Sequence, residues 1–143
     1  MSVYHANEFI VGLPEGLKDK TVHIFSLTDE GPSELSVVVA RERPKSGETL
    51  ERFGERLLSA LISRLPLFHV SKKEVTSLSG QPAISTEYSW QSPEGKMFQR
   101  QIILHARAQN QMLLITATCR GDKIAAKWEA MFGEFLTNFR LRA

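Results

Sequence analysis

The chain has 143 residues, which fits one domain with a single sizeable core, so we expect a single domain over residues 1–143. Hydrophobic residues make up 42% and charged residues 24%, a globular composition that excludes long disordered tracts. The net charge is only +2 and the basic residues are scattered, so nothing indicates a nucleic-acid partner.

Two further features indicate the compartment. Residues 1–8 lack the basic and apolar regions of a secretory signal, and no apolar run approaches the ~20 residues that cross a bilayer. Cys119 is the single cysteine, so no disulfide can form within the chain. We therefore expect a cytoplasmic protein with no stable insertion into the membrane.

The first third of the chain predicts strands. Residues 9–11 are typical of a short strand, which the segment of residues 13–16 with its Pro and Gly ends. Residues 21–27 and 34–42 are rich in Val, Ile and Phe, and a turn-forming segment separates them. These two strands are expected to form a hairpin.

A first helix is predicted over residues 48–65, because apolar side chains recur there at spacings of three and four. Ser46 or Thr49 fits its N-cap, and Pro66 ends it.

The second half of the chain predicts strands over residues 70–78, 83–91, 96–108 and 111–119, with a hairpin loop at 92–95 and a two-residue turn at 109–110. A second amphipathic helix follows, with Asp122 as its expected N-cap. This order predicts an α+β fold: a single antiparallel sheet of about six to seven strands with two amphipathic helices packed on one face.

The strands have one unusual property: several carry apolar residues on both faces. Val22 and Ile24 alternate with Phe25 and Leu27, and the strand of residues 34–42 is similar. If both helices cover one face, the other must meet something else. Three interpretations remain open at this point: a face covered by loops or a helix, a homodimer interface, or a groove for an apolar peptide or helix.

Polar residues in the same strands favour a groove over a sealed core. Gln99, Gln101, Thr116 and Thr118 share the second face, and burying them without partners would be costly. In a groove they are able to pair with a bound backbone.

No catalytic constellation competes with a binding role. His5, His23, His69 and His105 have no zinc-binding spacing, and Cys119 has no histidine motif nearby. No phosphate loop, dinucleotide fingerprint or nucleophile elbow is present. We expect no enzyme activity, no catalytic residue, no cofactor and no metal.

The segment of residues 9–25, FIVGLPEGLKDKTVHIF, resembles the opening of the Eag proteins, the effector-associated chaperones of bacterial type VI secretion systems. The strand of residues 35–43 and the helices near 49–65 and 128–139 keep the same order, so the resemblance covers nearly the whole chain. The wider PsbP-like superfamily shares this fold. The resemblance implies a homodimer that binds the N-terminal transmembrane helices of a PAAR-containing effector until the effector is loaded on the secretion spike.

Carried onto this chain, the family's groove implies an effector-binding surface made of Val22, Ile24, Val37, Val39, Leu65, Leu67, Gln101 and Ile103. Such a surface makes physical sense, since a transmembrane helix in water needs its apolar side chains shielded. The alternative within the superfamily is a protein-binding regulator or adaptor without a chaperone role, which would use loops such as residues 28–33 or 92–95.

Overall fold

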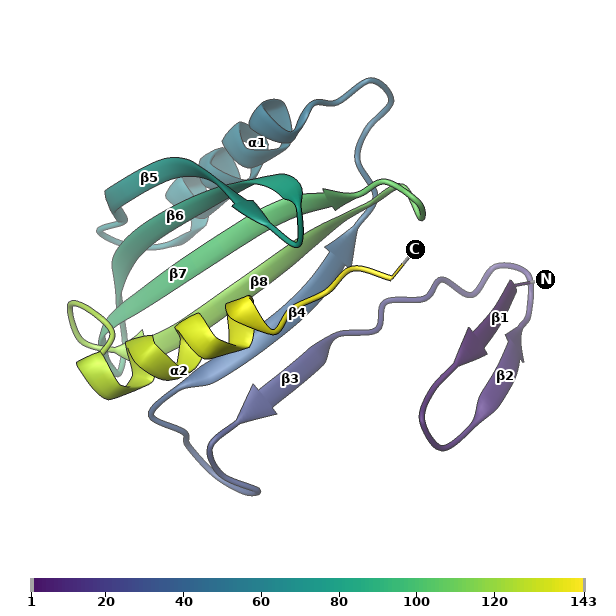
Figure 1. The fold of residues 1–143 in the computed structure, drawn as a ribbon. Coiled ribbons are helices and arrows are strands. Elements are labelled where there is room, and N and C mark those ends of the chain that lie inside the picture. Colours follow the sequence, from purple (N-terminus) through teal and green to yellow (C-terminus); the bar gives the residue numbers. More distant parts are fainter. Residues whose placement is uncertain (1, 143) are drawn as a thin grey trace.

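The computed structural model describes residues 2–142, which form eight strands and two helices. The strands β1 (Ser2–His5) and β2 (Ile10–Leu13) pair only with each other, in a hairpin that lies to one side of the main body (Figure 1). The remaining six strands form one antiparallel sheet in the order β3-β4-β8-β7-β6-β5. They are β3 (His23–Ser26), β4 (Ser36–Glu42), β5 (His69–Leu78), β6 (Gln81–Ser92), β7 (Gly95–Ala106) and β8 (Gln111–Arg120).

The expected α+β class and antiparallel pairing are confirmed. The β3–β4 hairpin is present, and β6 and β7 pair through a tight turn at Pro93 and Glu94. The N-terminal strand of the small hairpin, β1, was not predicted. It is short and isolated, so it carries too few residues for an alternation pattern.

The first helix, α1 (Leu50–Arg64), begins as expected. The Thr49 hydroxyl accepts a hydrogen bond from the Arg52 N–H at 3.2 Å, and the helix ends before Pro66. The second helix, α2 (Ala126–Thr137), begins after Ala125, which provides no side-chain cap. The predicted Asp122 N-cap is wrong, because Asp122 lies too far upstream and pairs with Lys96 at 2.6 Å.

The two helices lie on opposite faces of the sheet, and the prediction that both pack on one face is wrong. Phe132 of α2 belongs to an apolar cluster with Ile102, whereas Phe53 of α1 packs with Ile103. Neighbouring residues of a strand point to opposite faces, so these clusters are on opposite sides. Figure 1 shows α2 in front of the sheet and α1 behind it.

Helix α1 covers only part of the sheet face on which it packs. A Cβ at Gly54 would lie 3.1 Å from Ile103 Cδ1, so the glycine allows a close approach over β7 and β6. A helix with side chains is about 10 Å wide, and strands lie about 4.8 Å apart, so α1 covers roughly two strands. The part of this face formed by β3, β4 and the C-terminal half of β8 therefore extends beyond the helix, whereas Met112 and Leu114 of β8 belong to the cluster under α1.

Candidate functional site: the open face of the sheet

The surface that α1 leaves uncovered is defined by the sheet register. Cross-strand partners point to the same face, and one row runs from Ile24 through Val38 and Thr116 to Gln101. The next row runs from Ser26 through Ser36 and Thr118 to Gln99. We call this surface the open face; with Ala40, its residues are Ile24, Ser26, Ser36, Val38, Ala40, Gln99, Gln101, Thr116 and Thr118.

The β3–β4 side of the open face carries its apolar residues, Ile24, Val38 and Ala40, beside Ser26 and Ser36. Ile24 is 68% exposed, and Val38 beside it is half-buried. Strand β3 is the last strand of the sheet, so its outer backbone edge is unpaired. An exposed apolar side chain on an unpaired edge strand favours association with another chain.

The β7–β8 side of the open face is polar and internally ordered. The Tyr88 hydroxyl donates to Gln99 Oε1, and Gln99 Nε2 donates to the Thr118 hydroxyl at 2.9 Å. Gln101 Nε2 donates to the Thr116 hydroxyl at 3.4 Å. Each amide keeps hydrogen-bonding capacity beyond these bonds, so both glutamines are able to bind a further backbone or side-chain group.

Burial fixes the protonation of Tyr88 in this network. It raises the pKa of the Tyr88 hydroxyl to about 12. The phenol therefore remains protonated near neutral pH and keeps donating to Gln99, which holds that amide in one orientation.

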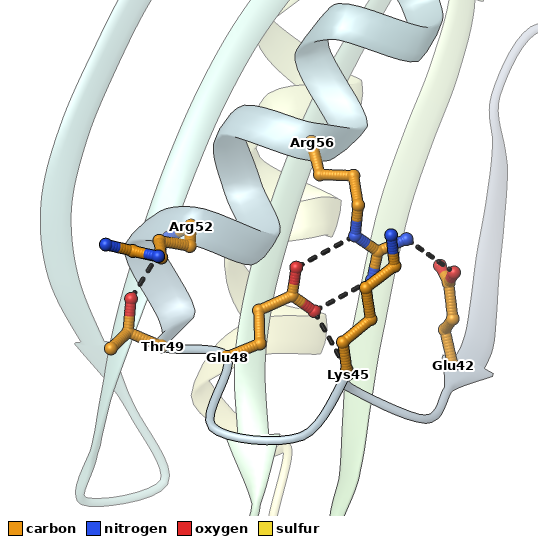
Figure 2. Close-up of polar contacts among 6 residues, drawn as sticks. All are labelled: Glu42, Lys45, Glu48, Thr49, Arg52 and Arg56. Carbon is orange, nitrogen blue, oxygen red and sulfur yellow. Dashed lines mark hydrogen bonds and ion pairs between the residues drawn. The ribbon is translucent and has the colours of Figure 1, made fainter.

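An ion cluster anchors the N-terminal end of α1 next to the open face (Figure 2). The Arg56 guanidinium donates through Nε and Nη2 to both carboxylate oxygens of Glu48 at 2.8 Å, and through Nη1 to Glu42 at 3.2 Å. The Lys45 N–H donates to Glu48 as well, at 3.1 Å. Because Glu42 ends β4, the cluster ties α1 directly to a strand of the open face.

Glu48 is the central group of this cluster. Its side chain is only 8% exposed. The hydrogen bonds from Arg56, followed by that from Lys45, lower the pKa of Glu48 from its usual 4.5 to about 2. The carboxylate therefore stays ionised, and the paired fork of Arg56 restricts the position of the helix.

Of the eight residues predicted to bind an effector, the open face contains Ile24 and Gln101. Val22 lies directly before β3 and is 48% exposed. The prediction that Gln99, Gln101, Thr116 and Thr118 share one face is confirmed by the register.

The prediction that Val37 and Val39 share one surface with Ile24 is wrong. The register pairs Val37 with Phe25 and Val39 with His23, so both valines point toward α2. Val37 is only 6% exposed and belongs to the core cluster there. Of the two alternating sets in β4 and the residue before it, the bulkier one (Leu35, Val37, Val39) packs in the core. Bulk was the available signal, since Ser36 and Ala40 bury less apolar area.

The other three predicted residues do not adjoin Ile24. Ile103 is buried beneath α1. Leu65 and Leu67 follow α1, where the Gln91 N–H donates to the Pro66 carbonyl at 2.9 Å, so this segment lies beside the end of β6. Strand β6 is separated from β3 by three strands. Leu67 is 82% exposed, but it is not part of the open face.

Residues 2–142 contain no group of three His, Cys, Asp or Glu side chains able to hold a metal ion. His105 Nε2 lies 3.0 Å from Asn110 Oδ1, and Cys119 is buried, which raises the pKa of its thiol. Within that range no helix has the length and apolarity needed to cross a membrane.

The fold and the open face define the class as an α+β protein whose six-stranded antiparallel sheet lies between two helices. The chain belongs to the DcrB family, whose model matches residues 9–131.

The chain is also similar to one curated protein in sequence and to one solved structure in fold. The chain is 25% identical to Effector EagT6 of Pseudomonas aeruginosa strain PAO1 over 119 residues, which cover 82% of this chain and 83% of that protein. This similarity supports the resemblance to the Eag family. The fold is similar to that of PA94 from Pseudomonas aeruginosa, solved as a protein of unknown function and putative regulator. That match has a TM-score of 0.83 and 23% identity, and it covers 100% of this chain and 98% of PA94.

Proposed function

We propose that this protein is a cytoplasmic chaperone that binds the N-terminal transmembrane helices of a PAAR-containing type VI secretion effector. It shields these helices from water until the effector is loaded on the secretion spike. The open face carries the proposal, because it exposes apolar side chains over strands that α1 does not cover. The similarity to Effector EagT6 supports the assignment to type VI secretion.

The chemistry of the open face suits a transmembrane helix. None of its nine side chains is charged, and transmembrane segments rarely carry charge themselves. The apolar side at Ile24 and Val38 is available for an apolar helix face. The polar side at Gln99 and Gln101 is available where such a helix exposes Ser, Thr or freed backbone groups.

The dimensions of the open face limit how much of a helix it shields. On β4 the open face runs from Ser36 to Ala40, which at about 3.4 Å per residue corresponds to roughly 17 Å. A transmembrane helix of about 20 residues is about 30 Å long. The open face of one copy therefore shields about half the length of such a helix.

The β1–β2 hairpin supports a homodimer. A two-stranded sheet by itself is at best marginally stable in water. Val3, Phe9, Ile10 and Val11 of this hairpin and its turn are all exposed. Packing of the hairpin against a second copy would cover these side chains, so the proposed functional unit is a dimer.

Co-expression with an effector's hydrophobic N-terminal segment tests the proposed function. Ile24→Asp should abolish co-purification of that segment, because it places a charge where an apolar helix would bind. Ile62→Asp is the matched control. Ile62 is 62% exposed, and it lies nine residues after the buried Phe53, half a turn around α1, so it points away from the sheet.

The outcomes separate the proposal from its alternatives. Binding that survives Ile24→Asp, or an effector segment that is equally soluble without this protein, contradicts the chaperone role. Loss of binding on substitution in the loops of residues 28–33 or 92–95, with the open face unaffected, would favour a regulator or adaptor.

A further inference from the structure

A second polar feature lies on the opposite face of the sheet from the open face. The end of α2, the β5–β6 turn and β7 together line an open pocket of about 300 Å³. Its floor is apolar and its other lining residues are arginines or hydroxyl residues. The lining consists of Thr76, Ser77, Leu78, Ser79, Arg100, Ile102, Leu136, Thr137 and Arg140.

Both arginines are held in place by groups other than carboxylates. Arg140 Nη1 donates to the Thr137 and Phe139 carbonyl oxygens, each at 2.8 Å. The Arg100 guanidinium lies over the Phe132 ring, 5.5 Å from its centroid. A stacked guanidinium is engaged through its flat face, so its N–H groups remain free to donate in the plane.

The charge of the pocket is not balanced within the described residues. No acidic residue lines it, and among residues 2–142 neither arginine forms an ion pair. Glu87 is opposite Arg100 in the β6–β7 register but does not pair with it or line the pocket. Two guanidinium groups around one small pocket repel each other, and a bound anion would remove that repulsion.

Ser79 adds a hydroxyl in an uncommon backbone conformation. Its φ is +51°, a left-handed value that side chains other than Gly, Asn and Asp rarely adopt, and Gly80 follows at +75°. The Ser79 hydroxyl oxygen accepts a hydrogen bond from the Leu141 N–H at 2.9 Å, which leaves its O–H free to donate. An Asp here would suit the turn equally well, but it would bring a negative charge to the pocket.

We propose that this pocket binds a phosphate group, with Arg100 and Arg140 as charged donors and Ser79 as a hydroxyl donor. Guanidinium N–H groups match the spacing of two phosphate oxygens, and a donor from the β5–β6 turn suits a third oxygen of a tetrahedral anion. The group is either free inorganic phosphate or the phosphate-monoester headgroup of a lipid. This site is independent of the proposed effector-binding face, because it lies on the other side of the sheet.

Nuclear magnetic resonance of the full chain, labelled with ¹⁵N, tests the proposal. Sodium phosphate is titrated against sodium chloride at matched ionic strength, and the amide signals of Ser79, Gly80 and Leu141 are followed. Phosphate should shift them saturably, with a dissociation constant in the millimolar range. Arg100→Gln should weaken binding at least about tenfold, whereas Arg142→Gln, an exposed arginine outside the pocket, should leave it unchanged.

Ser79→Gly is a second variant, and it tests the pocket even if Arg100→Gln fails to fold. It should fold normally, since glycine adopts a φ of +51° without strain. It should weaken phosphate binding several-fold. Two results would overturn the proposal. One is that phosphate shifts the amide signals linearly and no more than chloride does; the other is that Arg100→Gln and Arg142→Gln bind phosphate with equal affinity.

Vesicle sedimentation then distinguishes the two sources of phosphate. Phosphatidylcholine vesicles are compared with vesicles that also contain phosphatidic acid. Binding to the latter that inorganic phosphate competes away identifies a lipid headgroup. Saturable phosphate shifts without vesicle binding identify free phosphate. Neither outcome depends on effector binding, which the Ile24→Asp experiment tests separately.

Discussion

Val37 and Val38 are adjacent on β4 but point to opposite faces, and this pair offers a direct test of where the open face lies. We consider the change of each valine to threonine. Threonine keeps the branched shape and the strand propensity of valine, so the two variants differ chiefly in where the new hydroxyl is placed. Val37 is 6% exposed in the core beneath α2, whereas Val38 is half-buried beside Ile24.

The expected magnitudes differ clearly. A hydroxyl buried without a hydrogen-bond partner costs about 1–3 kcal/mol in proteins. Val37→Thr should therefore lower the free energy of unfolding by about that amount. Val38→Thr should change it by no more than about 0.5 kcal/mol, because water reaches the new hydroxyl.

Urea unfolding at one fixed protein concentration, followed by circular dichroism, measures both values. The slope of the unfolding free energy with urea should be the same in both variants, so that a change in midpoint reports stability alone. If Val38→Thr is destabilised as strongly as Val37→Thr, the open face is covered by the protein's own chain. The proposed effector site would then be in the wrong place.

Three further changes test the way in which α1 is anchored. Because the pKa of Glu48 is lowered to about 2, its ion pairs should stabilise the fold above pH 4.5 and lose that effect as pH falls toward 2. Urea midpoints of Glu48→Gln should accordingly lack this part of the pH dependence. Gly133→Ala in α2 should raise the free energy of unfolding by roughly 1 kcal/mol in thermal unfolding, because nothing lies within 4 Å of the added Cβ. Gly54→Ala in α1 should give no such increase, because its Cβ crowds Ile103. Thr49→Ala should cost about 1 kcal/mol by the same measurement, since it removes the N-cap hydrogen bond.

The sequence contained most of the element pattern. The spacing of Leu50, Phe53 and Leu57 predicted α1 because an amphipathic helix exposes one stripe to the core. That Gln99 and Gln101 share a face with Thr116 and Thr118 could be predicted, because side chains two residues apart on a strand point to the same face.

Two properties of the site could not be read in the same way. The side of the sheet on which a helix packs depends on the path of its connecting loops. The apolar stripe of an amphipathic helix indicates only that the helix packs against the sheet, and it does not indicate which side of the sheet. The ion cluster of Glu42, Glu48 and Arg56 was missed as well. These residues are separated by six and eight positions along the chain, and the loop that brings them together has no repeating pattern.

The placement of the helices on opposite faces changes what two apolar faces imply. With both helices on one side, a whole face of six strands would have been left uncovered. With one helix on each side, each face is partly covered, and the exposure of its remaining apolar side chains depends on which other segments pack there. The α2 side gains cover from the segment after the helix, where Phe139 and Leu141 pack on the core. The α1 side has no comparable segment over Ile24 and Val38 among the described residues. The uncovered apolar surface is therefore narrower than the sequence suggested, about the width of a single helix, which is the size of partner that the proposed function requires.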